Sequence, residues 1–228
     1  MSFSFLLTAL WAAAQKIPTT LVLAVAPFLI GALVGLPLAL ARFFRVPVLR
    51  RVLNVGVNII KGVPVALMLM VFYVLCSSFF DPVMQQLHLP FAFRDFNKAL
   101  IAIAALSVYA AAALSEVFRG ALAAVRKGQY DASYAAGLSN AQALRRVILP
   151  QALPASLPMA CNIFIALIKA AAMASLISVI DVMNAAVNAA GGNYRYLEAY
   201  IAAALVYWGL CIAAERLFRL AERKVLLA

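Results

Sequence analysis

The chain has 228 residues, of which 67% are hydrophobic and 12% are charged, and its formal net charge is +11. Because soluble domains are about half apolar and about one quarter charged, this composition excludes an ordinary water-soluble protein. The positive charge does not indicate a nucleic-acid partner, since no basic stripe with interleaved aromatic residues accompanies it. We therefore expect a membrane protein that does not bind nucleic acid.

A helix that crosses a membrane needs about 20 mostly apolar residues, since each residue rises about 1.5 Å across a hydrocarbon core of roughly 30 Å. Five segments meet this requirement. They follow an aromatic and apolar stretch at residues 1–16, which is expected to form an interfacial helix. The predicted fold class is an all-α, polytopic membrane protein with five transmembrane helices. The expected spans are 17–41, 52–80, 99–125, 155–180 and 197–220.

Lysine and arginine residues collect in alternate connections between these spans. One set of connections contains thirteen of them and the other set contains four. Basic residues accumulate on the cytoplasmic side of membrane proteins, so this asymmetry predicts an N-terminus outside and a C-terminus in the cytoplasm. The thirteen are Arg42, Arg45, Arg50, Arg51, Lys61, Arg126, Lys127, Arg145, Arg146, Arg216, Arg219, Arg223 and Lys224.

The connection between the third and fourth spans is the longest polar segment on the predicted cytoplasmic side. Gly137 interrupts it, and Ser139 or Asn140 can cap a short helix over residues 141–148, which Pro150 would end. We therefore expect two short helices joined at Gly137. Connections that are this long and structured are usually functional.

A spaced pattern runs through this connection, residues 126–153. An Asp-Ala-Ser group is followed after three residues by Gly137, and nine residues later by Val-x-Leu-Pro. The pattern resembles the conserved cytoplasmic loop of ABC importer permeases, which has Glu-Ala-Ala at the first group and Ile in place of Val. By this resemblance, the loop transmits the motion of a separate ATPase to the spans. The matching residues are Asp131, Ala132, Ser133, Gly137, Val147, Leu149 and Pro150.

Other parts of the chain are similar to the polar amino-acid branch of that family. The segment 61–64, Lys-Gly-Val-Pro, resembles the Arg-Gly-Thr-Pro of the branch, and the segment 116–120 resembles its Glu-x-x-Arg-Gly pattern. The resemblance covers nearly the whole chain from about residue 18. It implies a single ABC transporter type-1 transmembrane domain over residues 1–228. It also implies a permease subunit for a polar amino acid in the bacterial cytoplasmic membrane.

The resemblance also sets the expected partners. The chain contains no Gly-x-x-x-x-Gly-Lys-Ser/Thr phosphate-binding loop, so ATP hydrolysis is expected in a separate ABC ATPase dimer and this chain is expected not to be an enzyme. A second permease subunit, either the same chain or a paralogue, is expected to complete the pathway. An extracytoplasmic substrate-binding protein would deliver the amino acid. Membrane lipid surrounds the spans, and no cofactor is expected in this chain.

Charged and polar residues inside spans are costly and usually functional. Glu116 and Arg119 are three residues apart on one helix face and are expected to pair, which leaves two roles open for Glu116: a structural one, or contact with a cationic substrate. Asn162 matches an asparagine of the branch, but Ile163 stands where many members carry an acid. Either the substrate is not arginine-like, or this subunit is the less engaged half of a heteromer. Lys169 is expected to face the bundle interior or a partner subunit.

Two other classes of membrane protein fit the sequence less well. A secondary transporter would show internal inverted repeats, which five spans do not accommodate evenly. A membrane-embedded enzyme would need paired carboxylates, a histidine cluster or a nucleophile beside a base. The only histidine, His88, is expected to be an ordinary loop residue. The cysteines lie in apolar spans without the spacing of a metal or redox pair; they are Cys76, Cys161 and Cys211.

Overall fold

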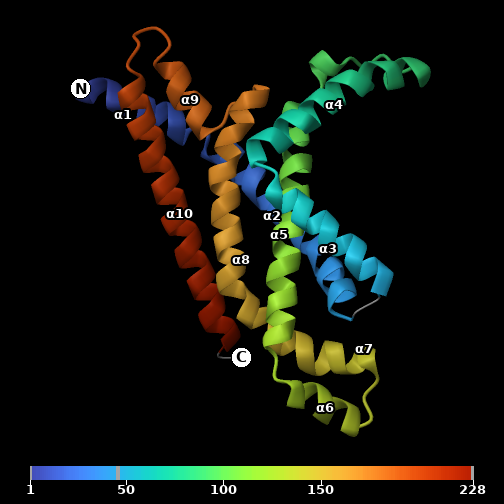
Figure 1. The fold of residues 1–228 in the computed structure, drawn as a ribbon. Coiled ribbons are helices and arrows are strands. Elements are labelled where there is room, and N and C mark those ends of the chain that lie inside the picture. Colours follow the sequence, from blue (N-terminus) through green and yellow to red (C-terminus); the bar gives the residue numbers. More distant parts are fainter. Residues whose placement is uncertain (1, 45–46, 227–228) are drawn as a thin grey trace.

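The computed structural model describes residues 2–44 and 47–226, and within these ranges it contains helices and turns but no strand. Five helical stretches are long and apolar enough to cross a membrane, which confirms the all-α, five-span fold. Helix α1 (Phe3–Ala14) lies at one end of the bundle, and the last turns of α10 (Tyr196–Leu226) reach the other end (Figure 1). The spanning stretches are Ile17–Phe43, Val65–Gln86, Lys98–Ala124, Asn140–Ile177 and Tyr196–Lys224.

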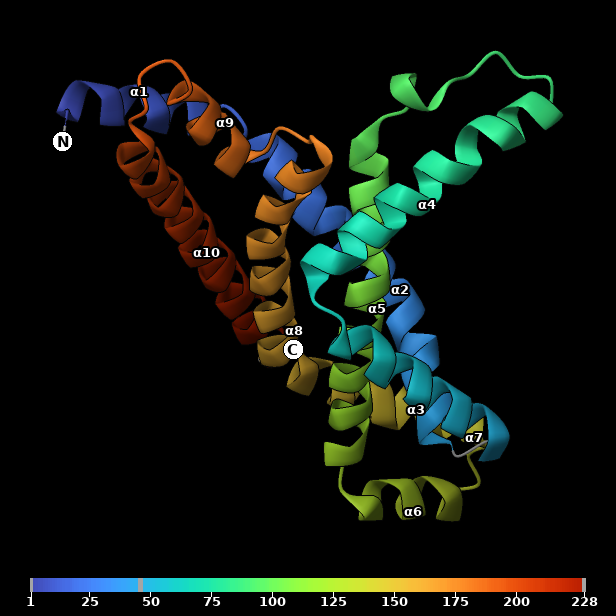
Figure 2. The same ribbon diagram turned by 45° about the horizontal axis from the view of Figure 1, so that its top comes forward.

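The helices follow one another through short connections (Figure 2). The first half of the chain forms α2 (Ile17–Phe43), α3 (Pro47–Gly62), α4 (Val65–Gln86), a 3-10 turn (Phe93–Asp95) and α5 (Lys98–Ala124). The second half forms α6 (Lys127–Ala135), α7 (Asn140–Ala143), a π-helical segment (Leu144–Ile148), α8 (Leu149–Ala171), a second 3-10 turn (Ala172–Ile177) and α9 (Val182–Ala189), before α10.

Helix α5 is the centre of the bundle, and most of its side chains are buried. Helices α2, α3, α4 and α8 pack around it. Helices approach each other closely in membranes where their contact residues are small. At Gly31 of α2, an added Cβ would lie only 2.5 Å from the Cβ of Ala110 on α5. A larger residue at Gly31 would therefore force the two helices apart.

A second cluster joins α1, α9 and α10 at the end of the bundle that carries α1. Asp181 caps α9: its Oδ1 accepts a hydrogen bond from the backbone N–H of Asn184 at 2.9 Å, and its Oδ2 accepts one from the Tyr207 hydroxyl at 2.5 Å. The Thr20 hydroxyl of α2 accepts a bond from the backbone N–H of Val182 at 3.2 Å. The connection after the fourth span therefore contains a helix that is fixed to α2 and α10, and the sequence pattern did not predict it.

The second span is shorter than expected. The predicted single helix over residues 52–80 is wrong, because α3 ends at Gly62 and α4 begins at Val65. The cause is Pro64, which has no backbone N–H and disfavours a helical conformation at Val63. Helix α3 is a separate amphipathic helix. Its polar side chains share one side; they are Arg50, Arg51, Asn54, Asn58 and Lys61.

The fourth span is longer than expected and begins at Asn140 rather than at residue 155. The predicted stop at Pro150 does not occur, because this residue lies in the first turn of α8, where its missing N–H is not needed. The turn before it, Leu144–Ile148, is π-helical. A π-helical turn has a wider hydrogen-bond spacing, which relieves the clash between the proline ring and the carbonyl four residues before it.

Candidate functional site

Helices α6 and α7 project from the ends of α5 and α8, at the end of the bundle opposite α1 (Figures 1 and 2). The turn between them contains Gly137, whose φ of +76° lies in the left-handed region that favours glycine. No neighbouring atom lies within 4 Å of the position that a Cβ would take at Gly137. The predicted joint between two short helices is therefore present, and it is open on its outer side.

Ser139 begins α7 with a capping box. Its hydroxyl accepts a hydrogen bond from the backbone N–H of Gln142 at 3.4 Å, and the Gln142 side chain accepts one from the backbone N–H of Ser139 at 3.0 Å. This reciprocal arrangement satisfies two backbone donors at the helix start. Of the two residues considered for this cap, the structure uses Ser139.

Tyr130 attaches α6 to the spanning helices. Its ring stacks on Phe43, the last residue of α2, with centroids 5.9 Å apart, and its hydroxyl donates to the carbonyl of Leu122 on α5 at 2.9 Å. Burial, and then the neighbouring Tyr134, raise the pKa of the Tyr130 phenol, so it stays a neutral donor. The position of α6 is therefore tied to the ends of both α2 and α5.

The residues of the predicted loop pattern divide into two groups. Asp131, Ala132, Gly137 and Pro150 are exposed. The other three face the protein: Ser133 is buried and donates to the carbonyl of Gln129 at 2.7 Å, while Val147 and Leu149 are half-buried against α5 and α8. The exposed group includes the residues that a docked partner could touch, and the second group holds the shape of the loop.

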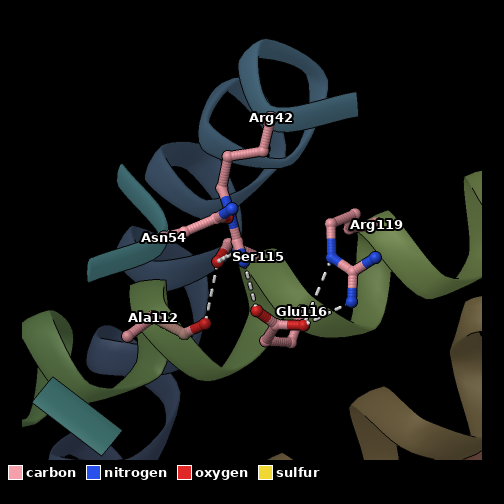
Figure 3. A network of polar contacts seen from close by, with 6 residues as sticks. All are labelled: Arg42, Asn54, Ala112, Ser115, Glu116 and Arg119. Carbon is pink, nitrogen blue, oxygen red and sulfur yellow. Dashed lines mark hydrogen bonds and ion pairs between the residues drawn. The ribbon is translucent and has the colours of Figure 1, made fainter. Parts of the chain in front are cut away.

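A network of polar side chains lies between α2, α3 and α5 (Figure 3). Arg42 at the end of α2 is only 4% exposed, and its Nε donates to Oδ1 of Asn54 on α3 at 2.7 Å. Its other nitrogens donate to the Ser115 hydroxyl at 3.1 Å and to Oε1 of Glu116. Oε2 of Glu116 accepts from Arg119 at 2.8 Å. The expected Glu116–Arg119 ion pair is therefore present, and Arg42 extends it to two further helices.

This network occupies both oxygens of the Glu116 carboxylate. Arg42 is buried and Glu116 is half-buried, and charges removed from water are costly unless they are paired and hydrogen-bonded, as both are here. The sequence indicated neither Arg42, which was assigned to a loop, nor Asn54, which was assigned to the second span. The signal that could have revealed α3 as a polar-faced helix is the spacing of Asn54 and Asn58, four residues apart.

Asn162 and Lys169 lie on one face of α8, seven residues or about two turns apart, and both are exposed. Lys169 therefore does not point into the interior of this chain. Asn162 lines a cavity of about 210 Å³ between α8 and α10, together with Glu215 and Arg219, whose side chains pair at 2.5 Å. The structure does not bring Glu116 to this cavity, because Glu116 belongs to the network of α2, α3 and α5.

Comparison with known proteins gives consistent similarities. Residues 28–227 match the family described as binding-protein-dependent transport system inner membrane component. The probable amino-acid permease protein YxeN of Bacillus subtilis (strain 168) is 34% identical over 226 residues, which cover 98% of this chain and 95% of YxeN. The L-cystine transport system permease protein TcyL of the same organism is 33% identical over 213 residues, which cover 92% of this chain and 85% of TcyL. A crystal structure of an amino acid ABC transporter with histidines matches with a TM-score of 0.81 and 27% identity, covering 98% of this chain and 99% of the other.

Proposed function

The chain belongs to the family of binding-protein-dependent transport system inner membrane components, and from this premise we propose that it carries a polar amino acid into a bacterial cell. As a member of the family it is a multi-pass inner-membrane protein and an amino-acid permease subunit of the ABC type. The ATPase of such a transporter is a separate subunit, so this chain is not itself an enzyme. The family also implies a substrate-binding protein as a partner.

The observation that carries the proposed mechanism is the projecting pair α6 and α7. We propose that the ATPase docks on its exposed residues, including Asp131, Ala132 and Gly137, because small residues permit the close approach of a partner. Ser133, Val147 and Leu149 would hold the pair in shape. ATPase closure would then move α6, and through it the spans.

We propose that α6, α7 and the end of α10 lie in the cytoplasm. The connections at this end of the bundle contain most of the lysine and arginine residues, as cytoplasmic connections do. Helices α1 and α9, at the opposite end, would then face the outside, where the binding protein delivers its amino acid.

A second permease subunit, the same chain or a paralogue, would complete the pathway. The exposed polar face with Asn162, Lys169, Glu215 and Arg219 lies on spanning helices, and such residues face water-filled paths or partner proteins rather than lipid. We propose that Asn162 and Lys169 line the pathway.

We assign Glu116 the structural role, because two arginines occupy its oxygens. The name of TcyL, for L-cystine transport, supports a polar amino acid as substrate.

Substitution of Gly137 tests the docking proposal. In Gly137→Trp the bulky side chain enters open space on the chain itself but obstructs a docked ATPase, so uptake should fall at least tenfold while the permease is still inserted in the membrane. That fall corresponds to a loss of about 1.4 kcal/mol or more. The measurement is ATP-driven amino-acid uptake, together with the amount of ATPase that purifies with the permease.

Two control variants separate obstruction of the ATPase from strain within the permease itself. Gly137→Ala tests the strain of the positive φ alone, which costs roughly 1–2 kcal/mol in this chain. Gly192→Trp places the same side chain in open space at the opposite end, where it should leave ATPase association unchanged. Normal uptake by Gly137→Trp would rule out docking at this turn.

A further inference from the structure

The last two residues of α2 contact different parts of the molecule. Phe43 stacks on Tyr130 of α6, with ring centroids 5.9 Å apart and planes inclined by 28°. Arg42, directly before it, donates to Asn54 of α3 at 2.7 Å and to Ser115 of α5 at 3.1 Å. One helical turn therefore joins the proposed ATPase-docking element to two helices of the bundle.

Helix α3 has a break at one end and a polar link to α2. Its end is separated from α4 by the break at Val63 and Pro64, where the backbone leaves the helical conformation. In the part of the chain that the structure describes, the Arg42–Asn54 bond is the only side-chain hydrogen bond that links α3 to another helix. By contrast, α2 and α5 meet backbone to backbone at Gly31, so these two helices behave as one body. Helix α3 therefore packs against α2 and α5 with Val57 buried, and Arg42 provides its polar side-chain link among the described residues.

We infer that the end of α2 is a transmission junction, in which Phe43 receives the movement of α6, and Arg42 passes it to α3 through Asn54. Hinges are a few residues at the ends of elements that absorb changes in backbone angles, and the break at Val63 and Pro64 lies at such a place. Movement of α6 then turns α3 relative to α4 as part of the change that opens the pathway. Arg42 and Asn54 are positioning residues for transport. This inference rests on the proposed docking of the ATPase on α6 and α7.

The chemistry of arginine suits this junction. The planar guanidinium group presents several donors in fixed directions, and Arg42 uses three nitrogens on Asn54, Ser115 and Glu116 at once. Lysine carries a point charge on a flexible stem and does not reproduce this fork. Arg42→Lys should therefore keep the charge pair with Glu116 while weakening the link to α3.

The test uses Asn54→Leu in the complete transporter, reconstituted in liposomes with its ATPase and binding protein. The substitution keeps a similar side-chain volume and leaves the Arg42–Glu116 ion pair in place. We expect ATP hydrolysis to continue, while the amount of amino acid transported per ATP falls by about threefold or more. Asn58→Leu is the matched control, because Asn58 is exposed one turn further along α3 and makes no side-chain hydrogen bond among the described residues. Its transport ratio should equal that of the unmodified protein.

A conservative variant and a double-mutant cycle separate transmission from simple loss of stability. Asn54→Asp retains the acceptor for Arg42 and should restore the amount of amino acid transported per ATP. Phe43→Leu should lower the ratio on its own, and combining it with Asn54→Leu should lower it no further than the more severe single variant, because both interrupt one path. Independent, multiplicative effects would overturn the inference. If Asn54→Leu yields too little folded protein, Arg42→Lys takes its place in the cycle.

The same assay distinguishes failure of the inference from failure of the proposed function. If the unmodified transporter shows no ATP hydrolysis that responds to the loaded binding protein, the proposed function is wrong, and the inference fails with it. If the unmodified transporter responds but Asn54→Leu transports as much per ATP as Asn58→Leu, only the inference is overturned. In that case the ATPase still docks on α6 and α7, but its movement reaches α3 by another route.

Discussion

Gly31 lets α2 and α5 meet backbone to backbone, and this contact leaves no room for a methyl group. An added Cβ would lie 2.8 Å from the carbonyl carbon of Ala110 and 2.9 Å from the backbone nitrogen of Ala111. Backbone atoms in the middle of a helix do not move aside as a flexible side chain does. The absence of a side chain at this one residue therefore positions the central helix against the first span.

Gly31→Ala should lower the stability of the folded permease by about 1–3 kcal/mol, because overpacking displaces the helices. Gly209→Ala is the matched control, since Gly209 lies in a spanning helix with nothing within 4 Å of its Cβ position. The midpoint of thermal unfolding in detergent should fall for Gly31→Ala and stay constant or rise for the control. Equal midpoints for the two variants would contradict the close contact.

The role of Arg42 could not be predicted from the sequence. It follows directly on an apolar run, so it resembles any basic residue at the cytoplasmic end of a span. Only the folded chain brings Asn54, Ser115 and Glu116 around it, and those residues lie 12, 73 and 74 positions further along the chain. The Glu116–Arg119 pair was predictable, because spacing within one helix determines it. Contacts between helices are not encoded in any local spacing.

At the scale of elements, one carboxylate both caps α9 and links it to α10. Asp181 is fully buried, caps α9 through Asn184, and accepts the Tyr207 hydroxyl from α10. The sequence suggested only a polar outer connection here, since an aspartate in a loop and a buried aspartate look the same in one chain. Without this residue α9 would lose both its first-turn cap and its polar tie to α10.

Asp181→Ala should reduce the free energy of unfolding by about 2–4 kcal/mol, because it removes a helix cap and leaves the Tyr207 hydroxyl without its acceptor. Asp181→Asn keeps an acceptor and should recover most of the loss. Asp95→Ala removes an exposed carboxylate from the same end of the molecule and serves as the control. Thermal unfolding of the three purified variants provides the comparison, and similar midpoints for Asp181→Ala and Asp95→Ala would exclude this role.

The element boundaries show where hydropathy is informative and where it is not. Five spans were predictable, because the thickness of a membrane sets the length of an apolar helix. The division of the second span at Pro64 was not recognised, since apolar residues continue on both sides of it. The opposite error occurred at Pro150, which was expected to end a helix but lies in the first turn of α8. A proline alone therefore does not show whether a helix ends there. The conformation of the turn before the proline decides, and that turn is π-helical before Pro150.

At the scale of the whole molecule, the proposed orientation places α6 and α7 in the cytoplasm. A cysteine-free background, with Cys76, Cys161 and Cys211 replaced, allows single cysteines to be placed at exposed sites at each end. Gly192→Cys should react with a membrane-impermeant maleimide in intact cells lacking an outer membrane. Asn140→Cys should react only after the membrane is permeabilised. The reverse pattern would place the proposed ATPase-docking surface outside and contradict the orientation.

The most direct test is to purify the tagged permease from membranes in which the neighbouring genes are also expressed, and to measure ATP hydrolysis with candidate amino acids. We predict that an ATPase purifies with the permease, and that its activity rises when the binding protein is loaded with one polar amino acid. That result would also identify the substrate. Purification of the permease alone, with amino-acid transport into liposomes that does not depend on ATP hydrolysis, would contradict the proposed mechanism and indicate a secondary transporter.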